Sequence, residues 1–356
     1  MKEISRIRKK IDKIDQIILK NLLERLSIAR EIAKVKKEKG IEIYKSSREE
    51  KIIKNLLKKT PQDDAKIIEG IFRNIISSCR NIQRTLNISF LGPKATFTHQ
   101  ASQLIFGKFC NYTPALSIAD VFEDVETERA DYGVVPVENS TEGMVSATLD
   151  IFINSPLKII NEVFLPITLC LISKEKDIQK IRKIYSHASA FGQCKSFLAE
   201  FFPNAQKIEA YSTAEAVKIA SEEKNSAAIG SKFAAQLYNL NVLKQNIEDL
   251  SENYTRFFVL GRNLAQPSGE DKTSILFSLK DRPGALHDSL SPFKKRNINL
   301  TKIESRPSKR KPWEYFFFVD FFGHIKNKKI KDAIGELEKH CDTIKILGSY
   351  PVGKIL

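Results

Sequence analysis

The sequence predicts three domains: a helical N-terminal domain over residues 1–86, a two-lobed α/β domain over 87–265, and a small α+β domain over 270–356. The length of 356 residues exceeds what one hydrophobic core usually supports. Apolar residues near the N-terminus recur every three or four positions, whereas strand and helix patterns alternate after residue 87. A stretch rich in Gly, Pro, Ser and charge, residues 263–272, reads as a linker before the last domain.

The first domain is predicted to be helical throughout. The first helix, to about Lys39, carries one apolar face made of Ile4, Ile7, Ile11, Ile14, Ile18 and Leu22. A second helix is expected from Ser46 or Ser47, and a third to about Thr85. A first helix of this length would leave apolar surface bare beside two short helices. We therefore expect a second copy to pack there, giving a homodimer or homotetramer.

The central domain shows the alternation of an α/β fold. A strand at residues 88–91 precedes a Gly-Pro turn, and Ser117 is placed to cap a helix with Asp120 at its third position. Residues 132–137 read as a buried strand that ends in a polar loop. The segments 165–173 and 246–257 are the expected crossings between two lobes.

The last domain is predicted to be ferredoxin-like. Strands are expected near 273–279, 298–305, 314–322 and 343–349, with helices near 284–295 and 328–340. The order strand, helix, strand, strand, helix, strand is that of the split βαβ fold.

Composition restricts the function. The net charge of +15 is concentrated before residue 87 but spread around helices, so anionic small substrates explain it better than nucleic acid. No early apolar run suits a signal peptide or membrane span, so a cytoplasmic location is expected. The five cysteines stand far apart, which favours reduced thiols over disulfides or zinc. No metal or organic cofactor is expected.

Cations in the helical domain suggest an anion site. Arg25 and Lys36 are eleven residues apart and share one helix face, although a solvated edge would look the same. In order and spacing this region resembles the all-helical chorismate mutases, whose substrate-contacting positions correspond to Arg8, Arg25, Lys36, Arg48, Glu49 and Gln83. The resemblance implies that Arg25 and Arg8 hold the carboxylates of chorismate, with Arg8 supplied by the partner subunit. Lys36 and Gln83 would then address the ether oxygen, and Glu49 the ring hydroxyl.

Two positions depart from that family's pattern. Lys45 stands where the family usually has Asp, and Cys79 where it often has Ser. An added cation could weaken the activity, so a degenerate mutase domain that serves dimerisation is the alternative. Glu49 could also be only a helix cap.

Two segments of the central domain resemble the prephenate dehydratases. Residues 134–143 lead a buried strand into a polar turn, and residues 253–257 place a threonine and an arginine at a strand start. The resemblance implies a bilobal fold like that of periplasmic solute receptors, with prephenate bound between the lobes. Thr255 would assist the departing hydroxyl. The other implied contacts are Glu138, Asn139, Ser140, Thr141, Ser186, His187, Gln193 and Arg256.

Two further residues of this region bear on its fold and chemistry. Ala95 stands where that family favours glycine, and alanine would be strained if the turn needs a positive φ. His187 is expected to be a loop or packing residue rather than a base. A cytosolic ligand sensor that binds without catalysis is the alternative reading of the bilobal region.

The last domain resembles the amino-acid-binding ACT domains attached to prephenate dehydratases. A turn that begins at Asp281 and the end of the second strand carry the resemblance. It implies feedback inhibition by phenylalanine, bound between paired subunits. The implied effector contacts are Gly284, Ala285, Leu286, Glu304, Ser305, Arg306 and Pro307.

Overall fold

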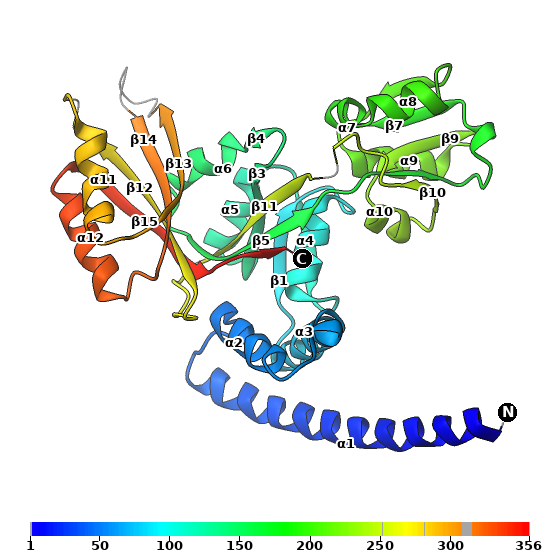
Figure 1. Cartoon of the computed structure of the whole chain (residues 1–356), viewed down its shortest axis with the longest axis horizontal. Coiled ribbons are helices and arrows are strands. Elements are labelled where there is room, and N and C mark those ends of the chain that lie inside the picture. Colours follow the sequence, from blue (N-terminus) through cyan, green and yellow to red (C-terminus); the bar gives the residue numbers. More distant parts are fainter. Residues whose placement is uncertain (1, 251, 281, 308–314, 356) are drawn as a thin grey trace. The chain divides into compact units, whose positions relative to one another are not determined.

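The computed structural model describes residues 2–250, 252–280, 282–307 and 315–355. They fall into two compact units: a helical unit of residues 1–86 with 106–111, and a larger unit of residues 87–105 with 112–356 (Figure 1). Among the described residues, no helix combines the length and apolarity that a membrane span requires.

The helical unit contains the three predicted helices. They are α1 (Lys2–Glu38), α2 (Ser46–Leu57) and α3 (Ala65–Gln83), with a short 3-10 turn, η1 (Gln62–Asp64), before α3. Both α1 and α2 pack against α3. The small core includes Tyr44 and Ile53, and the ring of Tyr44 packs on Phe106 at 4.9 Å between centroids.

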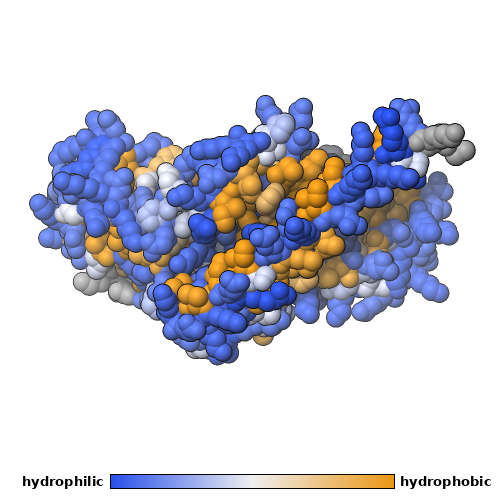
Figure 2. All heavy atoms as spheres, turned by 90° about the horizontal axis from the view of Figure 1, so that it is seen from below, coloured by the Kyte–Doolittle hydropathy of each residue, from blue (hydrophilic) through white to orange (hydrophobic). Residues whose placement is uncertain are grey.

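One apolar face of α1 is not covered within this unit. Ile4, Ile7, Ile11, Ile14 and Ile18 are each 49–58% exposed. Figure 2 shows hydrophobic side chains gathered on the face of the molecule to which α1 contributes. An amphipathic helix normally buries this stripe, so α1 retains a surface suited to another apolar helix.

The larger unit begins with one lobe built on a long mixed sheet, ordered β13-β14-β12-β15-β5-β11-β3-β1-β2. The strands of the first lobe are β1 (Asn87–Leu91), β2 (Asn111–Ala115), β3 (Tyr132–Asn139), β4 (Gly143–Met144), β5 (Lys158–Pro166) and β11 (Tyr254–Gly261). Its helices are α4 (Phe97–Phe106), α5 (Ile118–Glu126) and α6 (Ser146–Phe152). Ser117 and Asp120 form the predicted capping box of α5.

The second lobe is a separate five-stranded sheet, ordered β10-β6-β9-β7-β8. Its strands are β6 (Cys170–Ser173), β7 (Lys183–Ser186), β8 (Gln206–Glu209), β9 (Ser226–Gly230) and β10 (Asn241–Gln245). Its helices are α7 (Ala188–Gln193), α8 (Lys195–Phe201), α9 (Thr213–Glu222) and α10 (Lys232–Leu237), with a 3-10 turn, η2 (Ile178–Lys180). The chain crosses between lobes after β5 and before β11, as predicted.

The C-terminal domain has the predicted ferredoxin-like order. Its elements are β12 (Asp271–Leu279), α11 (Ala285–Lys295), β13 (Leu300–Pro307), β14 (Tyr315–Phe322), α12 (Lys328–Glu338) and β15 (Cys341–Pro351), followed by β16 (Lys354–Ile355). A Cβ at Gly348 would collide with the carbonyl oxygen of Ile159, so glycine lets β15 approach β5 of the first lobe.

A shared core joins this domain to the first lobe. Val137 and Phe258 of the lobe belong to the same buried cluster as Phe318, Leu347 and Tyr350 of the C-terminal domain. The predicted fold class, helical, two-lobed α/β and ferredoxin-like in that order, is confirmed.

Candidate functional site

Arg25 and Gln83 lie at the C-terminal half of α3 in the helical unit. Arg25 on α1 donates from Nη1 to the sulfur of Cys79 at 2.5 Å and to the carbonyl of Ile75 at 3.5 Å. Gln83 lies one turn beyond Cys79 on the same helix face. Among the described residues, its buried Oε1 has no hydrogen-bond partner. A polar atom left without a partner is available to a ligand.

Glu49 is held by a buried arginine. Arg80 Nη1 donates to Glu49 Oε1 at 2.6 Å, and the Arg80 side chain is 3% exposed. Burial raises the pKa of Glu49, while Arg80 opposes that shift. The helix-cap alternative is wrong, because α2 has Lys45 at its N-cap and no side-chain cap bond.

Lys36 interacts electrostatically with Glu49 and with Lys45. Its Nζ donates to the carbonyl of Ile43 at 3.0 Å. Burial and the charge of Lys45 lower the pKa of Lys36, and Glu49 partly offsets them. The unusual lysine at position 45 therefore acts on a residue of the candidate site.

Two of the predicted mutase residues are exposed, and one of them lies far from Arg25. Arg8 and Arg48 are exposed, and Arg8 lies 17 residues before Arg25 on the same helix. At about 1.5 Å rise per residue, the two α1 arginines are roughly 25 Å apart along the axis. One chain cannot bring both to a single small substrate.

The larger unit contains a pocket lined by both lobes, with a volume of about 610 Å³. The first lobe contributes Pro136, Asn139, Thr255 and Phe257, and the second lobe contributes the segments around His187 and Tyr211. The pocket therefore lies where the resemblance places the substrate.

A hydrogen-bond network orients the amide of Asn139. Its Oδ1 accepts from the backbone N–H groups of Thr141 and Glu142, both at 3.0 Å, and from the Thr141 hydroxyl at 2.7 Å. Three donors on one atom identify it as the oxygen, so Nδ2 is the atom that faces β11. Nδ2 donates to Thr255 Oγ1 at 2.9 Å and to Asn253 Oδ1 at 2.8 Å.

The network extends to the second lobe through Gln193. Asn253 Nδ2 donates to Gln193 Oε1 at 3.2 Å, and Gln193 Nε2 donates to Glu142 Oε1 at 3.0 Å. These bonds connect the α7 end of the second lobe to the polar turn of the first.

Ser140 and His187, two further predicted residues, form hydrogen bonds with nearby backbone groups. Ser140 Oγ accepts from the backbone N–H of Tyr254 at 2.9 Å, so it ties the polar turn to β11. His187 lines the pocket at the N-cap of α7, where Nδ1 accepts from the Ser189 N–H at 3.2 Å. This capping bond agrees with a loop role rather than a base.

Five predicted substrate contacts do not line the pocket. Ser186 is fully buried, and its hydroxyl donates to the carbonyl of Ile229 at 3.0 Å. Ser140 and Thr141 of the polar turn are not among the residues that line the pocket, and neither are Arg256 and Glu138. Glu138 instead forms an ion pair with Lys302 of the C-terminal domain, with 2.6 Å between Glu138 Oε1 and Lys302 Nζ.

Strand geometry explains the correction of Arg256 and Glu138. Successive side chains on a strand point to opposite faces, so the neighbour of Thr255 points away from the pocket. On β3 the register skips Val137, because Arg256 pairs with Glu138 and Phe257 pairs with Pro136. Such a bulge re-aims side chains. It leaves Pro136 and Asn139 on the pocket and turns Glu138 away from it.

Ala95 lies in the turn after β1, where backbone strain is expected if φ is positive. Ala95 has φ = 72°, so the turn does need the left-handed region. Its N–H donates to Nδ1 of the buried His99 at 3.1 Å, which holds the turn in place.

The expected effector segments lie at one end of the C-terminal domain. Gly284 is the N-cap of α11 with φ = 76°, a conformation that glycine adopts freely. Leu286 is 38% exposed. Along β13, Glu304 and Arg306 are half-buried while Ser305 and Pro307 are exposed. Asp281, where the resembling turn begins, lies outside the described residues.

Sequence reasoning missed three polar residues of these sites: Arg80, Glu142 and Asn253. Asn253 and Glu142 lie inside the segments that carry the resemblance, so their position in the motif was the available signal. Arg80 sits one turn before the end of α3, and nothing in its spacing marks it as the partner of Glu49.

Comparisons with known proteins agree with this arrangement. The chain matches the chorismate mutase type II family over residues 7–84, the prephenate dehydratase family over 88–265 and the ACT domain family over 273–339. A bifunctional chorismate mutase/prephenate dehydratase of Aquifex aeolicus is 46% identical, covering 99% of this chain and 98% of that protein. One from Pseudomonas aeruginosa is 39% identical, covering 98% of each.

A solved structure is similar over the larger unit. The prephenate dehydratase of Arthrobacter aurescens in complex with L-Phe is 35% identical, with a TM-score of 0.69, and the match covers 75% of this chain and 90% of that one. Together with the relatives above, which match over nearly the whole length of both chains, this defines the chain's membership. The chain belongs to the family of bifunctional chorismate mutase/prephenate dehydratases that carry an ACT domain.

Proposed function

We propose that the Thr255 hydroxyl donates a hydrogen bond to the departing ring hydroxyl of prephenate in the dehydratase reaction. The observation that carries the proposal is the bond from Asn139 Nδ2 to Thr255 Oγ1 at 2.9 Å. An amide nitrogen can only donate, so the threonine oxygen accepts, and its own hydrogen is not used in this bond. That hydrogen is available on the pocket side of β11.

The dehydratase reaction needs few other groups from the protein. The bond from the ring to its carboxylate breaks, and its electron pair forms the new ring double bond as carbon dioxide leaves. The bond from the ring to the hydroxyl oxygen breaks with its pair, and a proton delivered to that oxygen gives water and phenylpyruvate. An unassisted threonine is a weak acid, so Thr255 supplies hydrogen-bond assistance while solvent supplies the proton. Asn139 and Gln193, which line the pocket, are proposed to orient the substrate, and Thr141 to orient the amide of Asn139.

In the mutase reaction, we propose that charge placement is the main contribution. Chorismate rearranges within one molecule, so no nucleophile is needed. Arg25 would hold a carboxylate, Lys36 and Gln83 would stabilise charge at the ether oxygen, and Glu49 would hold the ring hydroxyl. Arg48 is proposed to close the site from α2.

A second copy of this chain is the proposed occupant of the apolar face of α1. The axial separation of Arg8 and Arg25, roughly 25 Å, means that a site using both must draw Arg8 from a partner. Pairing two α1 helices would also bury Ile7, Ile11 and Ile14. A homodimer therefore completes the mutase site, and an even-numbered assembly such as a tetramer is compatible with it.

The C-terminal domain is proposed to bind phenylalanine and lower dehydratase activity. Gly284 to Leu286 and the strand end from Glu304 to Pro307 would contact the effector between paired domains. Its binding would favour a less active arrangement. The five cysteines form no disulfide within the described part of the chain, which suits the reducing cytoplasm, the proposed location.

Supplying purified protein with chorismate and, separately, with prephenate tests this proposal. Loss of each substrate, with phenylpyruvate as the final product and a lower rate on adding phenylalanine, is the expected result. Turnover of prephenate alone would instead make the helical unit a degenerate mutase that serves dimerisation. Turnover of neither would favour a ligand sensor.

A further inference from the structure

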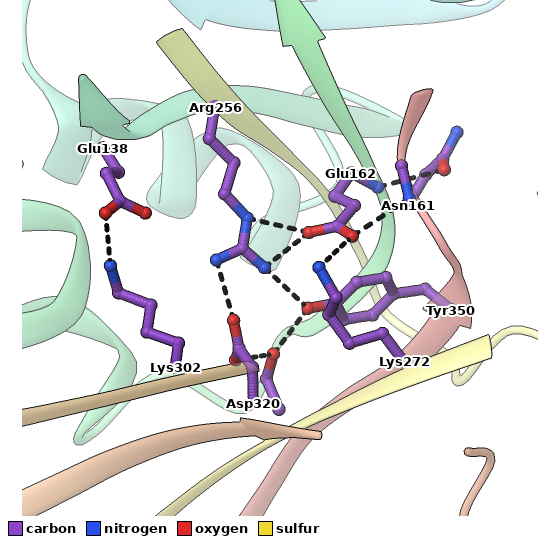
Figure 3. Close-up of polar contacts among 10 residues, drawn as sticks. Glu138, Asn161, Glu162, Arg256, Lys272, Lys302, Asp320 and Tyr350 are labelled. Carbon is purple, nitrogen blue, oxygen red and sulfur yellow. Dashed lines mark hydrogen bonds and ion pairs between the residues drawn. The ribbon is translucent and has the colours of Figure 1, made fainter. Parts of the chain in front are cut away.

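The C-terminal domain meets the first lobe through a buried cluster of charges, here called the ionic junction: Arg256, Glu162, Lys272 and Asp320 (Figure 3). Arg256 Nη1 lies 2.7 Å from Asp320 Oδ2, and Arg256 Nε donates to Glu162 Oε2 at 2.7 Å. Lys272 Nζ lies 2.6 Å from Glu162 Oε1. Asp320 and Lys272 belong to the C-terminal domain, whereas Arg256 and Glu162 belong to the lobe.

The ionic junction is balanced and closed to solvent. Its members are 1–7% exposed, and its two cations face two carboxylates. Neighbouring groups complete it: the Gly353 N–H donates to Glu162 Oε1 at 3.0 Å, and Ser274 donates to Asp320 Oδ1 at 2.5 Å. A guanidinium that bridges two carboxylates in fixed geometry couples the positions of the strands that carry them.

The ionic junction is directly linked along the chain to the dehydratase network. Arg256 follows Thr255 on β11, and Glu138 precedes Asn139 on β3. The register pairs Thr255 with Asn139 and Arg256 with Glu138. One cross-strand pair therefore faces the pocket, and the next faces the C-terminal domain.

The second of those pairs is also held by the C-terminal domain. Lys302 of β13 lies 2.6 Å from Glu138 (Figure 3). On β13, Lys302, Glu304 and Arg306 alternate with exposed residues and so share one face. Arg306 lies 3.4 Å from Asp150 of α6. The strand with the expected effector contacts is thus anchored to the strand that carries Asn139.

We propose that Arg256 and Glu138 are positioning residues, which hold Thr255 and Asn139 in register and transmit the state of the C-terminal domain to them. The inference rests on the proposed roles of Thr255, Asn139 and phenylalanine. Binding of an effector at the end of β13 changes where Lys302 and Asp320 lie, and the paired strands follow. A displacement of about 1 Å at a reacting group lowers a rate by about 100-fold, so a small shift suffices.

The first test compares Lys302→Gln with Lys331→Gln in the full-length protein. Lys331 is an exposed lysine on α12 and serves as the matched control. Dehydratase kcat and KM are measured with and without saturating phenylalanine. Phenylalanine lowers kcat/KM by some factor in each variant. We expect that factor to be about five or more times smaller in Lys302→Gln than in the control. Equal responses, or a wild-type enzyme that ignores phenylalanine, would overturn the inference.

The second test uses Arg256→Lys, which keeps the charge but cannot span both carboxylates. We expect kcat to fall about tenfold or more with little change in KM, because the bond from Thr255 to the departing hydroxyl strengthens mainly in the transition state. Mutase turnover of the same sample measures the amount of enzyme, and cooperative urea unfolding measures the folding of the larger unit. A loss confined to KM, or no change, would count against positioning. If this variant does not fold, the Lys302 comparison decides alone.

Failure of the inference can be told apart from failure of the proposed function. Thr255→Val is assayed alongside. If it retains turnover, the role of Thr255 is wrong and this inference falls with it. If it is inactive while Lys302→Gln responds like the control, only the coupling through the ionic junction is wrong.

Discussion

Asn139 and Thr255 lie opposite each other on β3 and β11, and Nδ2 of the asparagine donates to the threonine hydroxyl oxygen at 2.9 Å. The amide can take only this orientation, because its oxygen already accepts from Thr141 and Glu142. In the proposed mechanism, this bond orients the hydroxyl of Thr255 as a hydrogen-bond donor, although threonine is a poor acid by itself.

Asn139→Asp separates this orientation from the fold of the turn. A carboxylate oxygen still accepts the bonds from residues 141 and 142, but the second oxygen accepts from Thr255 instead of donating to it. The threonine hydrogen is then withdrawn from the substrate. We expect dehydratase kcat to fall about 100-fold or more while mutase turnover is retained. A kcat within threefold or so of wild type would exclude this orienting role.

The shared mutase site can be tested by complementation. Arg8→Ala and Arg25→Ala are each expected to lose most mutase activity. If the chain is a dimer as proposed, co-expression gives mixed dimers in which one of the two sites has both arginines. Because about half of the dimers are mixed, about a quarter of wild-type activity should return. Dehydratase activity monitors the amount of enzyme. No recovery in the mixture would show that Arg8 acts within its own chain or not at all.

The pH dependence of the mutase should report Lys36. Burial and Lys45 lower its pKa, so the charged form needed at the ether oxygen is lost as pH rises through that lowered value. Mutase kcat/KM should therefore decline on the alkaline side. Lys45→Asp removes a repelling charge and adds an attracting one, which should move the decline to higher pH. An unshifted profile in this variant would remove Lys45 from the electrostatics of the site.

Acid sensitivity of the first lobe should depend on His99. Burial and Lys94 lower its pKa from 6.5 to about 4. The folded state thus binds the proton less readily than the unfolded state, and stability falls as pH decreases from 6.5 toward 4. A shift of this size corresponds to about 3 kcal/mol.

The His99→Asn variant isolates that contribution. Its amide oxygen can still accept from Ala95, but it does not titrate. Urea unfolding of both proteins at pH 7 and near pH 4.5 should show a smaller loss of stability in the variant. Parallel losses in the two proteins would mean that other groups, such as carboxylates, account for the acid sensitivity.

Features with a local cause were predictable from the sequence. The capping box of Ser117 and Asp120 and the succession of strands and helices along the C-terminal domain follow from short-range patterns, and both are present. The direction of Arg256 was not predictable from its motif. It depends on strand alternation, the bulge at Val137 and a partner, Asp320, that lies 64 positions away in the sequence.

The pairing of Glu49 with Arg80 escaped prediction for a similar reason. The two residues are 31 positions apart on different helices, and only the packing of α2 against α3 brings them together. A sequence motif identifies which residues belong to a site, whereas the faces on which they lie follow from the tertiary structure.

The most direct test of the central claim compares Thr255→Val with Thr255→Ser in prephenate turnover. Valine keeps the shape of the side chain and removes the hydroxyl, whereas serine keeps the hydroxyl. We predict that the valine variant loses about 100-fold or more in kcat, with mutase activity intact, and that the serine variant keeps at least about a tenth of wild-type kcat. Equal activity of the two variants would contradict the assignment of Thr255 as the donor to the departing hydroxyl.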